Sequence, residues 1–161
     1  ALSTVMVVVQ SLFIVNRNGS LIYDQEFQEG KSSLSSNDKM RLSSTFHGIS
    51  AIAAQISPVK SVGGGSYSFL QPSGIVAIEA DTFRMQCFHT PTGMKFFCVA
   101  LPPYQDCEGL LRTIYGLYSD YALKNPFYKA DMPIRCELFD KEILRLFSGE
   151  GAALALGSAG K

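Results

Sequence analysis

The chain has 161 residues, which suits one domain, and 47% of them are hydrophobic while 17% are charged. Fourteen basic residues balance fourteen acidic ones, so no net charge attracts nucleic acid or an anionic membrane surface. The charged fraction is below the roughly 25% of an average globular protein, which leaves apolar surface for a protein partner. We therefore expect protein partners and no nucleic-acid partner.

The N-terminal part of the chain predicts a β-hairpin. Residues 5–15 are apolar and rich in β-branched side chains, and residues 20–27 form a second run that becomes polar toward its end, as on an edge strand. Residues 16–19 read Asn-Arg-Asn-Gly, which is a turn sequence. A short polar connection follows at residues 28–33.

A long helix is predicted next, starting at Ser35 and Ser36, whose hydroxyls can accept amide hydrogens, and closed by Pro58. Its apolar residues recur at spacings of four and three and predict one buried stripe, widened by Ala51 and Ile52. The stripe residues are Leu42, Phe46, Ile49, Ala53 and Ile56. The loop that follows contains a glycine run at 63–65 but lacks the lysine of a phosphate-binding loop. No function is predicted for residues 63–73.

A second hairpin at 81–101, preceded by a strand at 74–79, is the predicted centre of the fold. Phe83, Met85 and Cys87 alternate, which predicts a strand with one buried face. Residues 96–101 are apolar at every position, which predicts a central strand covered on both sides. Residues 90–93 read Thr-Pro-Thr-Gly and predict the turn between them.

Two helices are predicted after the second hairpin. The first, at 106–124, has a broad apolar arc and ends at Asn125 and Pro126. The second is predicted to open at Pro133. Its apolar residues are Cys136, Phe139, Ile143 and Phe147. Residues 149–161 lack an ordering pattern and are predicted to be a flexible tail, part of which need not be native.

The order strand, strand, helix, three strands, helix, helix predicts an α+β fold with one mainly antiparallel sheet. We expect one helix on one face of the sheet, two C-terminal helices, and a single domain over residues 1–148.

No catalytic, cofactor-binding or metal site is predicted, and no cofactor. The cysteines contain no C-x-x-C pair and are expected to be reduced and mostly buried, although their even number also fits a secreted disulfide framework. They are Cys87, Cys98, Cys107 and Cys136. Cys87 and His89 lie two apart on one strand, where contact is not assured and nothing nearby orients the imidazole, so a structural thiol is favoured. His47 has no ligand-spaced neighbour.

Four acidic residues near the last helix are interpreted as a solvated helix face, because Lys141 and Arg145 are interleaved with them. They are Asp131, Glu137, Asp140 and Glu142.

Two stretches resemble the synbindin family, the longin-like small subunits of the transport protein particle (TRAPP) complex. The first reads LSSNDKM at 34–40, TFHGI at 45–49 and QISP at 55–58; the second reads DTF at 81–83, TGMKF at 92–96, IYGLYSDYALKNPFY at 114–128 and MPIRCELF at 132–139. The resemblance covers most of residues 12–147. It implies the longin (SNARE-like) fold with sheet order 2-1-5-4-3.

The resemblance also implies a non-catalytic scaffold role in tethering transport vesicles between endoplasmic reticulum and Golgi. The implied partners are the other TRAPP core subunits and, through the assembled complex, a Rab-type small GTPase whose nucleotide exchange the complex promotes. The implied location is cytoplasmic, peripheral to cis-Golgi and endoplasmic reticulum membranes, with no membrane span. Animal synbindins carry a PDZ-like insertion after the second strand, and only residues 28–33 occupy that place here, so its peptide binding is not carried over.

The predicted interface combines aromatic side chains, which bury much area for few rotatable bonds, with a turn between the last two helices. Its candidates are Tyr115, Tyr118, Phe127, Tyr128, Met132, Ile134, Arg135 and Glu137. The apolar surplus predicts self-association of the isolated chain.

Two other hypotheses stay open. The first is a longin domain of another trafficking machine, such as an adaptor small subunit or a SNARE regulatory domain; the latter is disfavoured because we expect no heptad region or membrane anchor after residue 147. The second is a small-ligand or thiol enzyme on a profilin-like fold, motivated by Cys87 and Cys98.

Overall fold

The computed structural model describes residues 9–27, 34–56, 75–101 and 107–147. Its elements are β1 (Val9–Val15), β2 (Leu21–Glu26), α2 (Ser36–Ile56), β3 (Ala77–Glu79), β4 (Arg84–His89), β5 (Lys95–Ala100), α3 (Glu108–Leu117), a π-helical turn (Tyr118–Leu123) and α4 (Glu137–Phe147). The predictions that concern residues 5–8, 28–33, Pro58, the 63–73 loop and the 149–161 tail lie outside the described residues.

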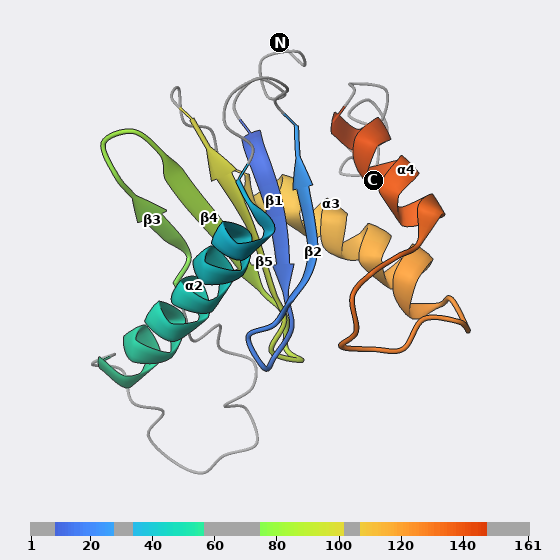
Figure 1. Ribbon diagram of the computed structural model, residues 1–161, viewed down its shortest axis with the longest axis horizontal. Helices are drawn as coiled ribbons and strands as arrows, with labels where there is room; N and C mark the ends of the chain where they lie inside the picture. Colours follow the sequence, from blue (N-terminus) through green and yellow to red (C-terminus); the bar gives the residue numbers. More distant parts are fainter. Residues whose placement is uncertain (1–8, 28–33, 57–74, 102–106, 148–161) are drawn as a thin grey trace, which may run out of the picture.

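The strands form one antiparallel sheet in the order β2-β1-β5-β4-β3, which confirms the predicted α+β fold and strand order. β5 is central, and its residues Phe96, Phe97 and Cys98 are completely buried, as the continuous apolar run predicts. β2 lies at an edge, also as predicted. The helices divide between the two faces: α2 lies across one, and α3 and α4 cover the other (Figure 1).

The turns of the two hairpins lie together at one end of the sheet. Gly19 and Gly93 both have positive φ, 87° and 88°, which glycine adopts without steric cost. A Cβ on Gly19 would lie 2.8 Å from the His47 ring of α2, and a Cβ on Gly93 would lie 3.2 Å from the Cβ of Arg17. Both predicted turns are therefore confirmed. Each glycine also packs against a neighbouring element, Gly19 against α2 and Gly93 against the other hairpin turn.

The core has one layer on each face of the sheet. Under α2, Phe97 stacks on both Phe13 and Phe46, with ring centroids 5.1 and 4.5 Å apart. On the other face, Phe139 of α4 packs edge-on against Tyr23 of β2 at 4.9 Å. Aromatic pairs of this kind add about 0.5–1.5 kcal/mol each beyond the area that they bury.

The start of α2 is confirmed, and its predicted stripe is confirmed only in part: Phe46 is buried and Leu42 packs beside it, but the isoleucines are exposed. The Ser35 Oγ accepts the amide hydrogen of Asp38 at 3.2 Å, as an N-cap does. The buried face, however, is centred on Phe46 and contains serines 43 and 50, while isoleucines 49, 52 and 56 are exposed. The face that meets the sheet therefore combines one large ring with two small residues, and the isoleucines lie outside it.

β4 also differs from its prediction of one buried face. Met85 and Cys87 are buried under α2, but Gln86 on the opposite face is buried too. Its Oε1 accepts the amide hydrogen of Cys107 at 2.9 Å, just before α3 begins. Gln86 is therefore a buried polar residue that holds the start of α3, and it does not face solvent.

The last two helices confirm the predicted apolar faces and correct two boundaries: α3 ends at Leu117, after which the predicted helix continues as the π-helical turn, and α4 starts later than predicted. Every residue of the broad α3 arc is buried or half-buried on the sheet side. α4 begins at Glu137 rather than at Pro133, because residues 133–136 first run beside β2, where the Ile134 N–H donates to the Ile22 carbonyl at 2.8 Å. The first helical bond then joins the Asp140 N–H to the Cys136 carbonyl.

Candidate protein-interaction surface

Residues 125–135, here called the 125–135 loop, connect the π-helical turn to α4 and are held by bonds within the loop. The Asn125 Oδ1 accepts the amide hydrogen of Phe127 at 3.0 Å, as in an Asx-turn. The Tyr128 hydroxyl donates to the Met132 carbonyl at 2.7 Å, and the Met132 N–H donates to the Lys129 carbonyl at 3.2 Å. The loop therefore has a defined shape of its own.

The same loop is fixed to the β1–β2 turn. The buried Asn16 donates through Nδ2 to the Asp131 carbonyl at 3.0 Å, and Arg17 pairs with the Asp131 carboxylate at 3.1 Å. Asp131 has a φ of 67°, a left-handed conformation that aspartate tolerates better than most residues. Figure 1 shows the loop, in orange, running back toward this end of the sheet.

The loop presents apolar side chains from this rigid frame. Phe127 is 96% exposed although its backbone is held, and Met132 is also exposed. Tyr128 is half-buried, with its ring edge-on to Tyr118 at a centroid distance of 6.5 Å. Because the backbone that carries Phe127 is already ordered, only side-chain freedom is lost when a partner covers the ring, which favours its use as an interface anchor.

The remaining predicted interface residues are dispersed. Arg135 and Glu137 are exposed at the start of α4. Tyr115 is half-buried, and its ring packs on Phe88 and Phe96 of the sheet.

Two of the predicted interface residues lie in the core of the chain. Tyr118 is 1% exposed and Ile134 is 6% exposed. Burial, followed by the neighbouring Tyr128, raises the pKa of Tyr118. These two side chains support the surface from beneath and do not present area to a partner.

A second exposed apolar feature lies on α2 and was missed by the sequence analysis. Ile49, Ile52 and Ile56, here called the α2 stripe, recur at spacings of three and four and are exposed, Ile56 to 75%. The signal that separates this stripe from the buried face is the pair Ser43 and Ser50, seven residues apart on either side of Phe46. Two small polar residues at that spacing mark a helix face that approaches a sheet closely.

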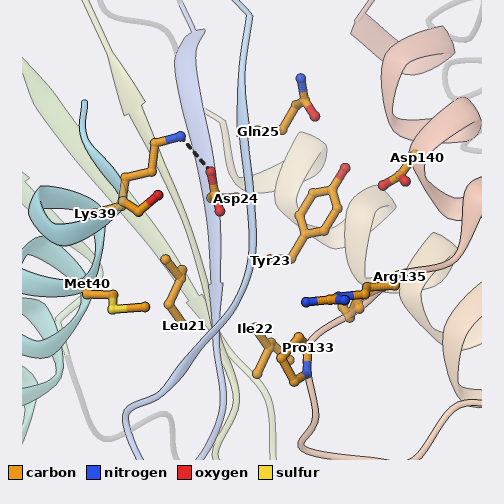
Figure 2. A pocket seen from close by; sticks show the side chains of 12 residues that line it. Leu21, Ile22, Tyr23, Asp24, Gln25, Lys39, Met40, Pro133, Arg135 and Asp140 are labelled. Atoms are coloured by element: carbon orange, nitrogen blue, oxygen red, sulfur yellow. Dashed lines mark hydrogen bonds and ion pairs between the residues drawn. The ribbon is translucent and has the colours of Figure 1, made fainter. Parts of the chain in front are cut away.

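A groove of about 490 Å³ follows the outer side of β2 between α2 and residues 133–140 (Figure 2). On its α2 side the Lys39 Nζ lies 2.7 Å from the Asp24 carboxylate and 3.3 Å from that of Glu26. The hydrogen bond to Asp24 raises the pKa of Lys39. The ammonium group therefore ties the start of α2 to the edge strand.

The Cys87–His89 pair is closer than predicted but does not form a nucleophile. Cys87 Sγ lies 3.4 Å from His89 Nε2, and the Ile75 carbonyl, 2.8 Å from the same nitrogen, orients the ring, so both geometric objections to the pair are wrong. Because a carbonyl oxygen only accepts, Nε2 carries the hydrogen and cannot take one from the thiol. Burial raises the pKa of Cys87 to about 12 and lowers that of His89. The thiol stays protonated.

The other polar groups that the sequence analysis singled out have structural surroundings in the described residues. All four cysteines are free and buried, as predicted. The interpretation of one solvated acidic face is wrong for Asp131, which pairs with Arg17, and for Asp140, which is half-buried beside Tyr23. Within the described ranges, no group of three His, Cys, Asp or Glu side chains could hold a metal ion. No helix in that part of the chain has the length and apolar character needed to cross a bilayer.

Comparison with known proteins gives the family. The model of the Sybindin-like family matches residues 9–150. The chain belongs to the Sybindin-like family. A curated protein of this kind, trafficking protein particle complex subunit 4 of Dictyostelium discoideum, is 47% identical over 138 residues, which cover 86% of this chain and 95% of the relative.

Other curated relatives match a smaller share of their own length or at lower identity. The subunit 4 proteins of Bos taurus and Mus musculus are 47% identical over 121 residues, 75% of this chain. The chain spans about half the length of these two relatives, 51% in each. Trafficking protein particle complex subunit 1 of Dictyostelium discoideum is 23% identical over 137 residues, 84% of this chain and 91% of the relative.

Proposed function

We propose that this chain is a non-catalytic scaffold subunit of a trafficking protein particle (TRAPP) complex and binds other core subunits of that complex. The observation that carries the proposal is the 47% identity to a protein named subunit 4 of such a complex, across 95% of that protein's length. The similarity extends over nearly the whole length of that relative and is not confined to one segment.

The geometry supports a binding role over an enzymatic one. The described residues present two apolar features on rigid supports, Phe127 on the 125–135 loop and the α2 stripe. Among the same residues, the pair nearest to a nucleophile and base, Cys87 and His89, has the wrong protonation state for that chemistry. Exposed, fixed apolar residues are typical of surfaces that another protein covers.

The finer part of the proposal rests on the family resemblance. We propose that the assembled complex promotes nucleotide exchange on a Rab-type GTPase and acts in transport between endoplasmic reticulum and Golgi. Its location would then be cytoplasmic, peripheral to cis-Golgi and endoplasmic reticulum membranes. Self-association of the isolated chain is expected through the exposed apolar features. The division into one domain at 1–148 and a tail at 149–161 stays a prediction.

The test is co-expression with the other TRAPP core subunits of the same organism, followed by size-exclusion chromatography with light scattering. We expect stoichiometric co-elution, no nucleotide exchange by the chain alone, and exchange on a Rab-type GTPase by the assembled core. Elution of the folded chain apart from folded partners would contradict the scaffold assignment. Exchange by the isolated chain would contradict its non-catalytic part.

Substitution of the loop anchor tests which surface is used. Phe127→Ser should weaken assembly about 10- to 100-fold, because a buried aromatic anchor contributes roughly 1.5–3 kcal/mol. Leu144→Ser is the matched control, since Leu144 is also an exposed apolar residue but lies on α4. Both variants should keep the unfolding free energy within about 0.5 kcal/mol of the parent chain. Equal effects of the two substitutions on assembly would exclude the 125–135 loop as the anchor.

A further inference from the structure

Among the described strands, none pairs with the outer edge of β2. The Phe27 N–H donates to the Gln10 carbonyl of β1 at 3.0 Å, and residues of a strand alternate in direction, so positions 23 and 25 also face β1. Asp24 and Glu26 therefore turn their N–H and C=O groups outward. The described residues supply two hydrogen bonds to these outward groups: the Ile134 N–H donates to the Ile22 carbonyl at 2.8 Å, and the Gln25 Nε2 donates to the Glu26 carbonyl at 3.1 Å. The N–H and C=O of Asp24 and the N–H of Glu26 receive none from these residues. An open edge of this kind is a template for another strand.

The groove around this edge has two different walls (Figure 2). On one side lie Met40, which is exposed and apolar, and Lys39, whose charge is already matched by Asp24 and Glu26. On the other side lie Arg135, which is exposed to solvent, and Asp140, which is half-buried. Side chains of an added strand alternate between these two walls.

The second wall contains an unsatisfied polar group. Tyr23 is only 7% exposed, and its hydroxyl has no hydrogen-bond partner among the described residues. Burial raises the pKa of Tyr23, and the charge of Asp140 and a hydrogen bond to its carboxylate, too weak to meet the ordinary distance and angle limits, raise it further. Asp140 itself forms no ion pair within the described ranges. A buried hydroxyl with so weak a contact destabilises the fold, and a ligand that supplies a good hydrogen bond recovers that loss.

We propose that the outer edge of β2 binds an extended segment of a partner protein as an added strand, with a lysine or arginine of that segment at the corner formed by Tyr23 and Asp140. The backbone of the segment pairs with Asp24 and Glu26. Its cationic side chain donates to the Asp140 carboxylate and the Tyr23 hydroxyl oxygen, while neighbouring residues in the sequence of the segment face Met40. The inference depends on this chain's own backbone and does not rest on membership of a tethering complex.

The shape of the site favours a single peptide strand over a second copy of the chain. α2 and residues 133–140 flank the edge on both sides (Figure 2). The β2 strand of a second copy would bring its own two flanks into the same space. A separate extended segment has no such flanks, and main-chain pairing gives it affinity while the two walls select its side chains.

The first experiment uses a short acetylated peptide of alternating valine and lysine as the probe, with the full chain labelled for amide NMR. We expect shifts concentrated at Asp24 and Glu26, and affinity at least about tenfold above that of the valine–glutamate peptide, because a half-buried carboxylate rejects like charge. Methylation of alternate backbone nitrogens of the peptide, in the register that faces β2, should abolish the shifts at Asp24.

Variants of the chain test the corner itself. Tyr23→Phe should leave the unfolding free energy unchanged or higher, because it removes an unpaired hydroxyl, and should weaken the lysine peptide several-fold. Asp140→Asn should remove most of the preference for lysine over glutamate. Asp120→Asn is the matched control, since Asp120 is an exposed acid on the π-helical turn. It should change nothing.

Three results would overturn the proposal. Shifts that map away from Asp24 and Glu26, or no shifts up to millimolar peptide, would show that the edge does not accept a strand. Equal binding of lysine and glutamate peptides would exclude the Tyr23–Asp140 corner. If the Asp24 amide becomes better protected from hydrogen exchange as the protein concentration rises, without any peptide, the edge binds a second copy of the chain.

Discussion

Asn16 makes the link between the β1–β2 turn and the 125–135 loop directly testable. Its side chain forms three hydrogen bonds: Oδ1 accepts the amide hydrogens of Asn18 and Ser20 at 3.0 and 2.9 Å, and Nδ2 donates to the Asp131 carbonyl at 3.0 Å. Asn16→Ala removes all three. We expect a loss of about 2–3 kcal/mol in unfolding free energy, below three full bonds because the exposed turn amides can bind water instead.

Asn16→Asp separates the two roles of this side chain. The carboxylate still accepts from the turn amides but cannot donate to the Asp131 carbonyl, which it then faces with a negative charge. The loss should be about 1–2 kcal/mol. Urea unfolding gives the free energies, and native-state hydrogen exchange locates the effects.

The exchange pattern can refute this account. The loop amides of Tyr128 and Met132 should exchange faster in both variants, whereas those of Asn18 and Ser20 should do so in Asn16→Ala alone. Unchanged loop exchange in Asn16→Asp would mean that the bond to Asp131 does not hold the loop.

Two further predictions concern buried polar groups. Among the described residues the buried Ser50 Oγ has no hydrogen-bond partner, whereas the Ser43 Oγ donates to the Met40 carbonyl at 3.0 Å. Ser50→Ala should therefore be more stable than Ser43→Ala by up to about 1 kcal/mol in urea unfolding. The reverse order would mean that Ser50 has a partner. The pKa of Cys87 is raised from 9.0 to about 12, so the folded state keeps a proton that the unfolded state loses first. Stability should be complete below pH 9 and fall as the pH rises toward 12, and Cys87→Ala should reduce that fall in thermal unfolding across this range.

The sequence predicts what depends on local pattern. Residues 96–101 are apolar throughout, and that alone indicates the central strand, because only a strand covered on both faces tolerates such a run. The hairpin turns follow equally well from glycine at the two positive-φ positions. The strand order came from family resemblance, and the element order was consistent with it.

What the sequence misses depends on contacts distant in the chain. Phe127 and Ile134 are both apolar residues of one loop, yet the first is 96% exposed and the second 6%, because Ile134 lies beside the edge of β2, more than a hundred residues earlier. The α2 stripe is predicted to be buried for the same reason. Both the covered face around Phe46 and the α2 stripe have apolar residues at helical spacing. Only the position of the sheet decides which is covered.

The place of β5 between β1 and β4 has a consequence for biosynthesis. Each hairpin can form from neighbouring residues, but β1 and β5 join them through pairs such as Val9 with Ala100. Until residue 100 has left the ribosome, the inner edge of β1 is a bare, apolar template, and its pairing must await a contact of high sequence separation. The nascent chain is therefore most prone to aggregation after its first hairpin and before its fifth strand, the interval in which a chaperone would contribute most.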